Sequence, residues 1–314
     1  MRLDIIVPCH NEEEVLPLFY AECGKVLAEI RKEKDIESSF IFVDDGSKDN
    51  TLKLLKEFHE KDPFVRFISF SRNFGKEAAM YAGLQASEGD FVVIMDADLQ
   101  DPPSFLPKML DALLEEGYDC AAARRSDRKG EPAVRSWFAS KFYKLINHSA
   151  STKIEEGARD FRMMTRQMKD AVLELSEYNR FSKGIFSWVG FHTKWLPYEN
   201  VNRAAGKTKW SFKALSYYAI DGIVGFTVKP LEIAAWFGMI FFLLSIIGIL
   251  FIIVRKLLFG DPVAGWPSLV CIVLFCSGIQ LFCTGIIGEY LAKTYIEVKK
   301  RPLYIVRETE KGKP

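Results

Sequence analysis

The sequence of 314 residues lacks the cysteine patterns of disulfide-bonded or zinc-binding proteins. Its six cysteines stand singly, without a Cys-x-x-Cys pair, and three of them fall in one apolar run near the C-terminus. Neither a disulfide framework nor a zinc site is therefore predicted, and a reducing compartment fits. The chain also does not open with the basic region and apolar run of a signal peptide, because a strand pattern begins at Leu3. The polar part of the chain is thus expected in the cytoplasm.

An excess of charge of either sign is missing as well. With 42 basic and 41 acidic residues the formal net charge is +1, and no basic patch typical of nucleic-acid binding is visible, so no nucleic-acid partner is predicted. Neither a GxxxxGK[ST] phosphate loop nor a GxGxxG fingerprint is present. Binding of a dinucleotide through a glycine cradle is therefore disfavoured.

The chain does contain two long uncharged runs, Ile233–Val254 and Pro267–Gly288. Each has 22 residues and would extend about 33 Å as a helix, which matches a hydrocarbon core of about 30 Å. A buried helix of a soluble protein is the alternative for either run, but two such runs in succession favour two membrane spans. The remaining residues are numerous enough to fill the core of one large soluble domain.

The N-terminal part alternates between strand and helix patterns. Short runs of β-branched and aromatic residues indicate buried strands, and apolar residues near helical spacing indicate helices between them. This series predicts an α/β fold, a mostly parallel sheet with helices on both faces and polar loops at the strand ends. The predicted strands are Leu3–Val7, Phe40–Val43, Val65–Phe70 and Phe91–Met95, and the predicted helices are Glu12–Arg31, Asn50–His59 and Gly75–Ser87.

An acidic cluster follows the last of these strands. Asp96, Asp98, Gln100 and Asp101 come within six positions, and two prolines then end the pattern. Ligands of open α/β sheets bind at the C-terminal ends of the strands, and oxygen ligands there suit a divalent cation that can hold a diphosphate. A solvated acidic turn is the alternative interpretation.

Two earlier loops are polar too. Pro8-Cys-His-Asn-Glu12 follows the first strand, and Asp44-Asp-Gly-Ser-Lys-Asp49 follows the second. An aspartate after the second strand can accept hydrogen bonds from a base or a ribose. The same stretch also makes a good turn and helix cap, through Ser47 or Asp49, so both interpretations stay open.

In order and separation, these motifs resemble those of family 2 glycosyltransferases with the GT-A fold. They are Val7-Pro-x-x-Asn-Glu12, Val43-Asp-Asp-Gly-Ser47 and Asp96-Ala-Asp-Leu-Gln-Asp-Pro-Pro103. More closely, the chain resembles the polyprenyl-phosphate glycosyltransferases, a group that includes dolichol-phosphate mannose synthase and the bactoprenol glucosyltransferases. The resemblance covers nearly the whole chain and continues through Gly157-x-x-Asp-Phe-Arg162, Arg180-Phe-x-Lys-Gly184, Arg203-x-x-Gly-Lys-Thr-Lys-Trp-Ser211 and Gly288-Glu-Tyr…Glu297-Val-Lys-Lys-Arg-Pro302.

The resemblance implies a site, residue by residue. Asp96, Asp98 and Gln100 would hold Mg²⁺ or Mn²⁺ on the donor's diphosphate, where the cation offsets charge that develops on the departing nucleoside diphosphate. Asp160 matches the position that the family assigns to a catalytic carboxylate, and it is predicted to act as an orienter or as a base. The predicted nucleotide-binding residues are Pro8, Asn11, Glu12, Asp44, Asp45, Lys76, Asp96 and Lys207.

The acceptor site can be argued from chemistry. A polyprenyl phosphate supplies its own nucleophilic oxygen, whose second pKa of about 6 leaves it largely ionised at neutral pH, so it needs orientation more than deprotonation. An arginine fork fits phosphate oxygens bidentately, although any one arginine can simply face water. The candidates for gripping the acceptor phosphate are Arg124, Arg125 and Arg135, and the predicted catalytic set is Asp160, Asp98, Arg125 and Arg162.

Aromatic and lysine-rich stretches at residues 134–146 and 210–218 are typical of helices at a membrane surface. A helix packed on the sheet is the alternative for the first. The loop between the apolar runs has two basic residues and the C-terminal segment has seven, so the positive-inside rule places both termini of this multi-pass protein in the cytoplasm, at the inner (plasma) membrane. Small residues in the second run would allow a homo-oligomer.

The predicted domains follow from these patterns. They are a cytoplasmic GT-A catalytic domain, an interfacial helix, a first transmembrane helix, a short extracytoplasmic loop, a second transmembrane helix and a basic cytoplasmic tail. Their bounds, in that order, are 1–210, 211–230, 231–254, 255–266, 267–288 and 289–314.

The hypothesis that results is an inverting transfer of one sugar from a nucleotide donor, UDP-glucose, to undecaprenyl phosphate at the cytoplasmic leaflet, for modification of cell-envelope glycans. UDP-GlcNAc, UDP-galactose and GDP-mannose are alternative donors, because the sugars differ by one or two hydroxyl contacts. A processive synthase would share the front half of the chain but needs a Gln-x-x-Arg-Trp element and more spans. A non-enzymatic lipid-sugar translocator or membrane scaffold would have no need of the acidic cluster.

Overall fold

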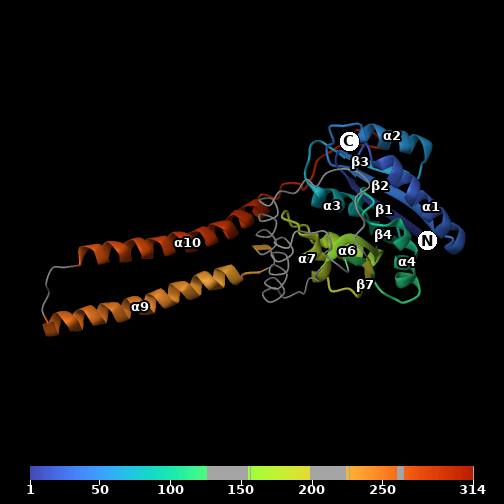
Figure 1. The fold of residues 1–314 in the computed structure, drawn as a ribbon. Helices are drawn as coiled ribbons and strands as arrows, with labels where there is room; N and C mark the ends of the chain where they lie inside the picture. Colours follow the sequence, from blue (N-terminus) through green and yellow to red (C-terminus); the bar gives the residue numbers. More distant parts are fainter. Residues whose placement is uncertain (126–154, 156, 199–223, 226, 260–264, 314) are drawn as a thin grey trace.

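The computed structural model describes residues 1–125, 155, 157–198, 224–225, 227–259 and 265–313. An α/β domain contains both ends of the chain, and two long helices project from it side by side (Figure 1). The predicted fold class is confirmed by this arrangement.

The domain has one sheet with helices on both faces. The strands are β1 (Arg2–Cys9), β2 (Glu37–Asp44), β3 (Val65–Phe70), β4 (Phe91–Ile94), β5 (Cys120–Arg125), β6 (Ala158–Thr165), β7 (Thr193–Tyr198) and β8 (Val306–Thr309). Within the described residues the helices are α1 (Leu16–Lys34), α2 (Thr51–Lys61), α3 (Lys76–Ala86), α4 (Leu106–Leu114), α6 (Arg166–Glu174), α7 (Ser182–Trp188), α9 (Lys229–Phe259) and α10 (Trp266–Val298), and η1 (Pro103–Phe105) is a 3₁₀ turn.

The strand order is β7-β5-β6-β4-β1-β2-β3-β8. Strands β1 to β4 are parallel, as predicted, whereas β6 and β8 run antiparallel to their neighbours β4 and β3. Along β1, Leu3, Ile5 and Val7 enter one hydrophobic core together with α1 and α4, whereas Ile6 enters the other together with α3. This period of two is what a strand buried on both faces requires.

The predicted helices are observed, with one shifted start. The first helix was expected from Glu12 but begins at Leu16, with Pro17 in its first turn. A proline has no N–H to donate and its ring clashes with the carbonyl four residues earlier, so it is tolerated at a helix start but not one turn inside. The second helix begins at Thr51 and its N-cap residue is Asn50, not Ser47 or Asp49 as predicted. Asp49 lies one residue earlier, and its carboxylate accepts from the Thr51 N–H at 3.0 Å.

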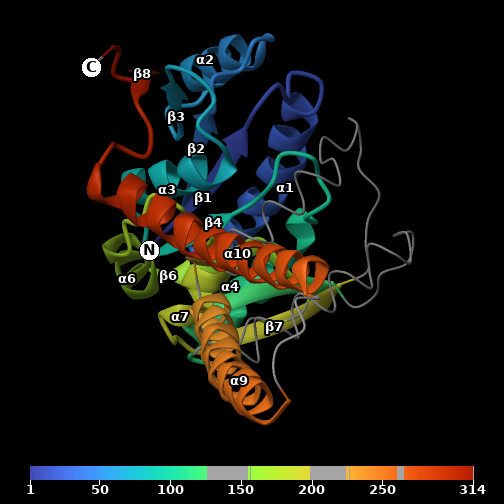
Figure 2. The ribbon, with the colours of Figure 1, turned by 90° about the vertical axis from the view of Figure 1, so that its left-hand side faces the viewer.

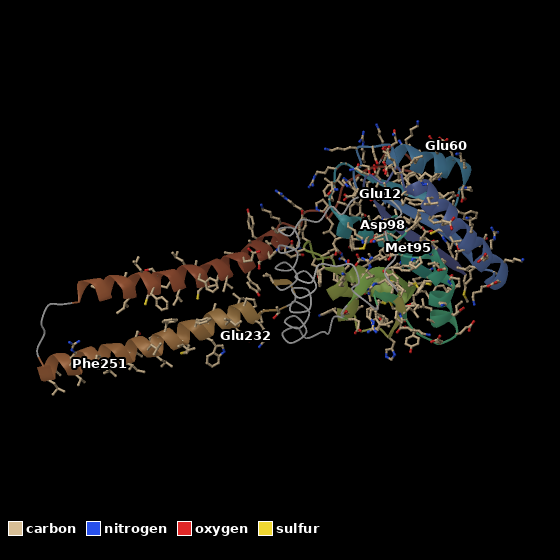
Figure 3. The ribbon with its side chains drawn as sticks, in the orientation of Figure 1. Glu12, Glu60, Met95, Asp98, Glu232 and Phe251 are labelled. Atoms are coloured by element: carbon tan, nitrogen blue, oxygen red, sulfur yellow. The ribbon has the colours of Figure 1, made fainter. Side chains whose placement is uncertain are left out.

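Helices α9 and α10 cover the two predicted spans and extend beyond them. Lys229–Gly248 and Ile272–Val298 are long and apolar enough to cross a membrane. The helices pack as an antiparallel pair, with Phe241 and Phe275 edge to face at 5.6 Å. Most of their large apolar side chains are exposed, and Figure 3 shows Phe251 far from the domain on α9. So much exposed apolar surface is typical of a segment that lies in lipid.

The prediction of a basic tail at 289–314 needs correction. Helix α10 continues to Val298, because no proline or glycine interrupts the chain between Gly288 and Pro302. The chain then returns to the domain, where β8 pairs antiparallel with β3 at the edge of the sheet (Figure 2). An unpaired edge strand offers a row of free backbone donors and acceptors, and β8 satisfies part of it.

Candidate active site

The acidic cluster lies where β4 ends, beside the end of β1. Asp96 and Asp98 follow directly after β4, and the turn is closed by Leu99 with a φ of 57°. Left-handed backbone is unusual for a bulky residue and is found mainly where function demands a particular turn. Here it lets the Asp98 carboxylate accept a hydrogen bond from the Gln100 N–H at 3.1 Å. The predicted metal-binding residues are therefore held on one tight turn.

Lys76 forms ion pairs both with the acidic turn after β4 and with β6, a strand far along the sequence. Its ammonium lies 2.7 Å from Asp96 Oδ1 and 2.8 Å from Asp160 Oδ2. Lys76 is the first residue of α3, directly after Gly75, and Asp160 comes from β6. Three residues that the sequence predicted separately, as nucleotide-binding, metal-binding and catalytic, are thus brought together around one positive charge.

The electrostatics favour the ionised forms of Asp160 and Lys76. Burial alone would raise the pKa of Asp160, but the ammonium of Lys76, together with Lys183 and Arg162, outweighs it and holds that pKa well below its usual range. Burial would likewise lower the pKa of Lys76, yet its two aspartates raise it. The carboxylates of Asp96 and Asp160 thus share the ammonium of Lys76.

The oxygen atoms of Asp96, Asp98 and Gln100 fit a divalent cation. In the described part of the chain, no three His, Cys, Asp or Glu side chains gather into a metal site by themselves. Mg²⁺ in proteins is commonly held by one or two carboxylates, while phosphates of the substrate and water complete its shell. The two carboxylates and the amide oxygen are ligands of this kind, and their role toward a metal ion stays a prediction.

Arg159 and Tyr198 support this turn and were not predicted. The Arg159 guanidinium donates to the Tyr198 hydroxyl oxygen at 3.0 Å and to Gln100 Oε1 at 3.4 Å. Beneath them Asp101 is buried, and burial together with the charge of Asp96 raises the pKa of Asp101 to about 7. The only signal in the sequence was the position of Arg159 next to Asp160.

A cavity of about 510 Å³ adjoins the ends of β1, β2 and β3. Asn11, with a φ of 55°, receives the Lys48 N–H on its Oδ1 at 2.8 Å, and its own N–H donates to Ser47 Oγ at 2.9 Å. The buried Asp44 accepts from the Ser47 N–H at 3.0 Å and from the Ser69 hydroxyl at 2.7 Å. Asp44 therefore fixes the turn and also lines the cavity, and its contact with a nucleotide stays a prediction.

The other predicted nucleotide-binding residues lie nearby or outside the described residues. Asp45 is buried and accepts from the Phe74 and Gly75 N–H groups at 2.6 and 2.9 Å. Pro8 lies in β1, and the Glu12 N–H donates to Thr51 Oγ1 at 2.9 Å. Asp45 thus sets the position of the first turn of α3, and through it the position of Lys76. Lys207 lies outside the described residues.

The described arginines that were predicted for the acceptor phosphate or for catalysis lie on the neighbouring strands β5 and β6. Arg162 is buried with its guanidinium 3.9 Å from the centre of the Phe186 ring. Arg124 forms an ion pair with Glu155, and Arg125 ends β5 with its backbone opposite Tyr198. Their role toward a phosphate stays a prediction. Arg135 and the helices predicted at 134–146 and 210–218 lie outside the described residues.

The chain is similar to several known proteins. CsbB of Bacillus subtilis (strain 168) is 44% identical over 306 residues, which are 98% of this chain and 91% of that protein. The SfII prophage-derived bactoprenol glucosyl transferase of Shigella flexneri is 40% identical over 314 residues, the full length of both. Among solved structures, mannosyl-3-phosphoglycerate synthase from Rubrobacter xylanophilus aligns with a TM-score of 0.49 at 19% identity, over 70% of this chain and 71% of that one.

The family itself is given by a match over the catalytic domain. Residues 4–173, more than half of the chain, match the model of Glycosyl transferase family 2. The matched region contains the ends of β1, β2 and β4, Lys76 and Asp160. The chain therefore belongs to glycosyl transferase family 2 and is a glycosyltransferase.

Proposed function

We propose that this glycosyltransferase moves a single glucose from UDP-glucose to undecaprenyl phosphate at the cytoplasmic leaflet of the plasma membrane, for modification of a cell-envelope glycan. The observation that carries the proposal is the full-length similarity to the Shigella bactoprenol glucosyl transferase. That similarity includes both apolar helices and the returning C-terminal strand, not the catalytic domain alone. UDP-GlcNAc, UDP-galactose and GDP-mannose are the alternative donors.

The reaction exchanges the bond between C1 of the sugar and the donor diphosphate for a bond between C1 and the lipid phosphate. A phosphate oxygen of the lipid attacks C1 of the sugar from the face opposite the nucleotide, the bond from C1 to the diphosphate oxygen breaks with its electron pair, and the nucleoside diphosphate leaves with inversion at C1. Asp96, Asp98 and Gln100 would hold a Mg²⁺ or Mn²⁺ ion that offsets the charge of the leaving diphosphate. Lys76, next to Asp96, is placed to donate to the same phosphates.

In this proposal Asp160 orients the Lys76 ammonium and does not remove a proton from the acceptor. Its carboxylate is ion-paired to Lys76 and holds that ammonium where the diphosphate would be bound. A carboxylate whose pKa is far below neutrality is a weak proton acceptor, and the lipid phosphate is largely ionised at neutral pH. Both facts favour positioning over proton removal.

The orientation in the membrane is supported by the returning strand. Because β8 pairs with β3, the C-terminal segment lies on the same side of any membrane as the catalytic domain. This common location agrees with two membrane spans and with the basic side chains between residues 289 and 314. The domain bounds 1–210, 211–230, 231–254, 255–266 and 267–288 and a homo-oligomer remain predictions.

The test is a transfer reaction with purified protein in lipid nanodiscs. Undecaprenyl phosphate, Mg²⁺ and one of UDP-glucose, UDP-GlcNAc, UDP-galactose or GDP-mannose are supplied, and the lipid product is identified by mass. We expect undecaprenyl phosphoglucose and release of UDP. If only another donor gives product, the transferred sugar is the sugar of that donor and not glucose. Hydrolysis of a donor without any lipid product would refute the proposal that undecaprenyl phosphate is the acceptor.

A further inference from the structure

One side chain that lines the cavity at the ends of β1, β2 and β3 comes from β8. The wall of the cavity is formed mainly by residues at the ends of β1, β2 and β3, among them Asn11, Asp44 and Ser69. Arg307 also lines it, from β8. This residue lies beyond both apolar helices in the sequence and outside the region that matches the family model.

Strand β8 is fixed in place by several contacts. Its residues pair with β3, and just before it the Ile305 carbonyl accepts from the Ser71 N–H at 2.9 Å. The ring of Tyr304 stacks on Phe70 at 4.7 Å. Glu308 forms an ion pair with Lys56 of α2 at 2.7 Å. The backbone that carries Arg307 is therefore well defined relative to the cavity.

Arg307 lies at a register shift between β3 and β8, where Ser69 pairs with Glu308 and Phe70 with Val306, so Arg307 is the extra residue of β8. A bulge of this kind can re-aim a side chain. Val306 packs against the hydrophobic core that contains α3, whereas Arg307 is exposed and lines the cavity. Lys48 and Arg72 line the same cavity. The lining thus contains one carboxylate, that of Asp44, and three long cationic side chains, so its positive charges outnumber its negative one.

The size and position of the cavity fit one part of a nucleotide donor. Its volume of about 510 Å³ lies within the range of roughly 300–1,000 Å³ for small-molecule sites. In the sheet, β4 and β8 are separated by β1, β2 and β3, which at about 4.8 Å per step is roughly 19 Å. A donor whose diphosphate lay at the end of β4 would have its nucleoside directed along this row toward β8.

We propose that Arg307 binds the nucleoside end of the donor and that β8 thereby completes the donor pocket. The inference deepens the proposed function and rests on it for the identity of the ligand as a nucleoside diphosphate. A planar guanidinium can stack on a base and donate to ribose or phosphate oxygens, so its removal should weaken nucleotide binding without any change at the acceptor.

The test measures binding of the nucleotide alone. Full-length wild type, Arg307→Ala, Arg307→Lys and Lys311→Ala are placed in nanodiscs with Mg²⁺, and UDP and GDP are titrated by calorimetry without acceptor. Lys311 is a matched control, an exposed cation four residues away that does not line this cavity. We expect Arg307→Ala to weaken the Kd of the preferred nucleotide about tenfold, Arg307→Lys to recover part of the loss, and Lys311→Ala to stay within twofold of wild type.

Steady-state kinetics give the second measurement. The KM for the nucleotide sugar should rise about tenfold in Arg307→Ala, with the KM for the lipid unchanged. A Kd within twofold of wild type would overturn the inference. If the alanine variant melts at a lower temperature than wild type, the lysine variant decides by the same criterion.

The outcomes separate this inference from the proposed function. A wild-type protein that binds UDP but makes no lipid-linked sugar would refute the proposed function, while loss of UDP binding in Arg307→Ala would still support the donor pocket. A wild-type protein that binds neither UDP nor GDP would overturn both.

Discussion

A single aspartate at one end of the sheet and a pair of aspartates at the other are held in different ways. Asp4, near the start of β1, is fully buried and accepts hydrogen bonds from the hydroxyls of Ser39 and Ser87 at 2.6 and 2.9 Å and from the N–H groups of Glu88 and Gly89 at 2.9 and 2.8 Å. Arg2 adds an ion pair at 2.8 Å. At the other end Asp96 and Asp160 share the ammonium of Lys76.

The difference separates a structural carboxylate from a functional one. The donors around Asp4 belong largely to the backbone and to short side chains, so they cannot leave without unfolding the sheet edge. The ammonium of Lys76 stands on a flexible four-carbon stem and can turn from a carboxylate to a phosphate. Fixed neutral donors therefore stabilise the fold, whereas a movable cation leaves a carboxylate ready to exchange partners.

The largest effect on turnover is expected from the metal-binding turn. Chelation of divalent cations, or Asp98→Asn, should reduce kcat/KM at least 1,000-fold, because the charge on the leaving diphosphate then loses several kcal/mol of stabilisation. Restoring Mg²⁺ or Mn²⁺ should rescue the chelated wild type but not the variant. The thermal midpoint of Asp98→Asn should match that of wild type, and full activity in excess chelator would remove the metal from the proposal.

Next in size is the loss of the shared ammonium. Lys76→Ala should lower kcat/KM about 100- to 1,000-fold, since it removes a donor to the diphosphate and leaves Asp96 and Asp160 to repel each other. Lys76→Arg keeps the charge and should recover part of the loss. Steady-state rates with saturating lipid measure the effect, and a loss below fivefold would contradict it.

A smaller effect is expected at Asp160. Asp160→Asn should lower kcat about 10- to 100-fold with little change in donor binding, because the lysine loses one of its two anchors. If Asp160 only orients Lys76, its loss lowers kcat by the same factor at every pH. The ratio of variant to wild-type kcat should therefore be constant between pH 6 and 9. Recovery of the rate on raising the pH would instead identify Asp160 as a general base.

The smallest effect on turnover, with the largest on stability, is expected at Asp4. Asp4→Asn should lower the free energy of unfolding by about 3 kcal/mol and the thermal midpoint by about 6–12 °C, with kcat per folded molecule unchanged. Burial would raise the pKa of Asp4, but Ser39, Ser87, Arg2 and Gly89 outweigh it and lower that pKa.

The lowered pKa of Asp4 also sets the sign of a pH effect. The stability that its carboxylate contributes is present above the unfolded pKa near 3.8 and is lost as the pH falls through the folded value. Thermal midpoints between pH 7 and 3 should therefore fall more steeply for wild type than for Asp4→Asn. Parallel curves would show that this carboxylate does not hold the sheet edge.

Much of the fold and part of the site follow from local patterns in the sequence. The strand that precedes Asp96 and the proline-limited start of α1 obey rules that act within a few residues, and the uncharged runs marked both long helices. Asp160 and Asp96 were predicted from motifs, but their common contact with Lys76 depends on how β6 returns beside β4. The ion pairs of Lys76 could not be predicted, because their partners lie far apart along the chain.

The C-terminal strand escaped prediction for a different reason. Val306–Thr309 has four residues and two charges, too short for its alternation to stand out from a solvated tail. It forms because β3 has an open edge, which is a property of the finished sheet. Arg307 was accordingly assigned to a tail and not to a site.

The pairing of β3 with β8 also sets an order of events during synthesis. Ile68 pairs with Thr309, so the partner of the third strand is synthesised only after both apolar helices. Until then the edge of β3 lacks this partner. Closure of the sheet at β3 therefore follows synthesis of the two apolar helices, and the part of the cavity wall that carries Arg307 is added after them.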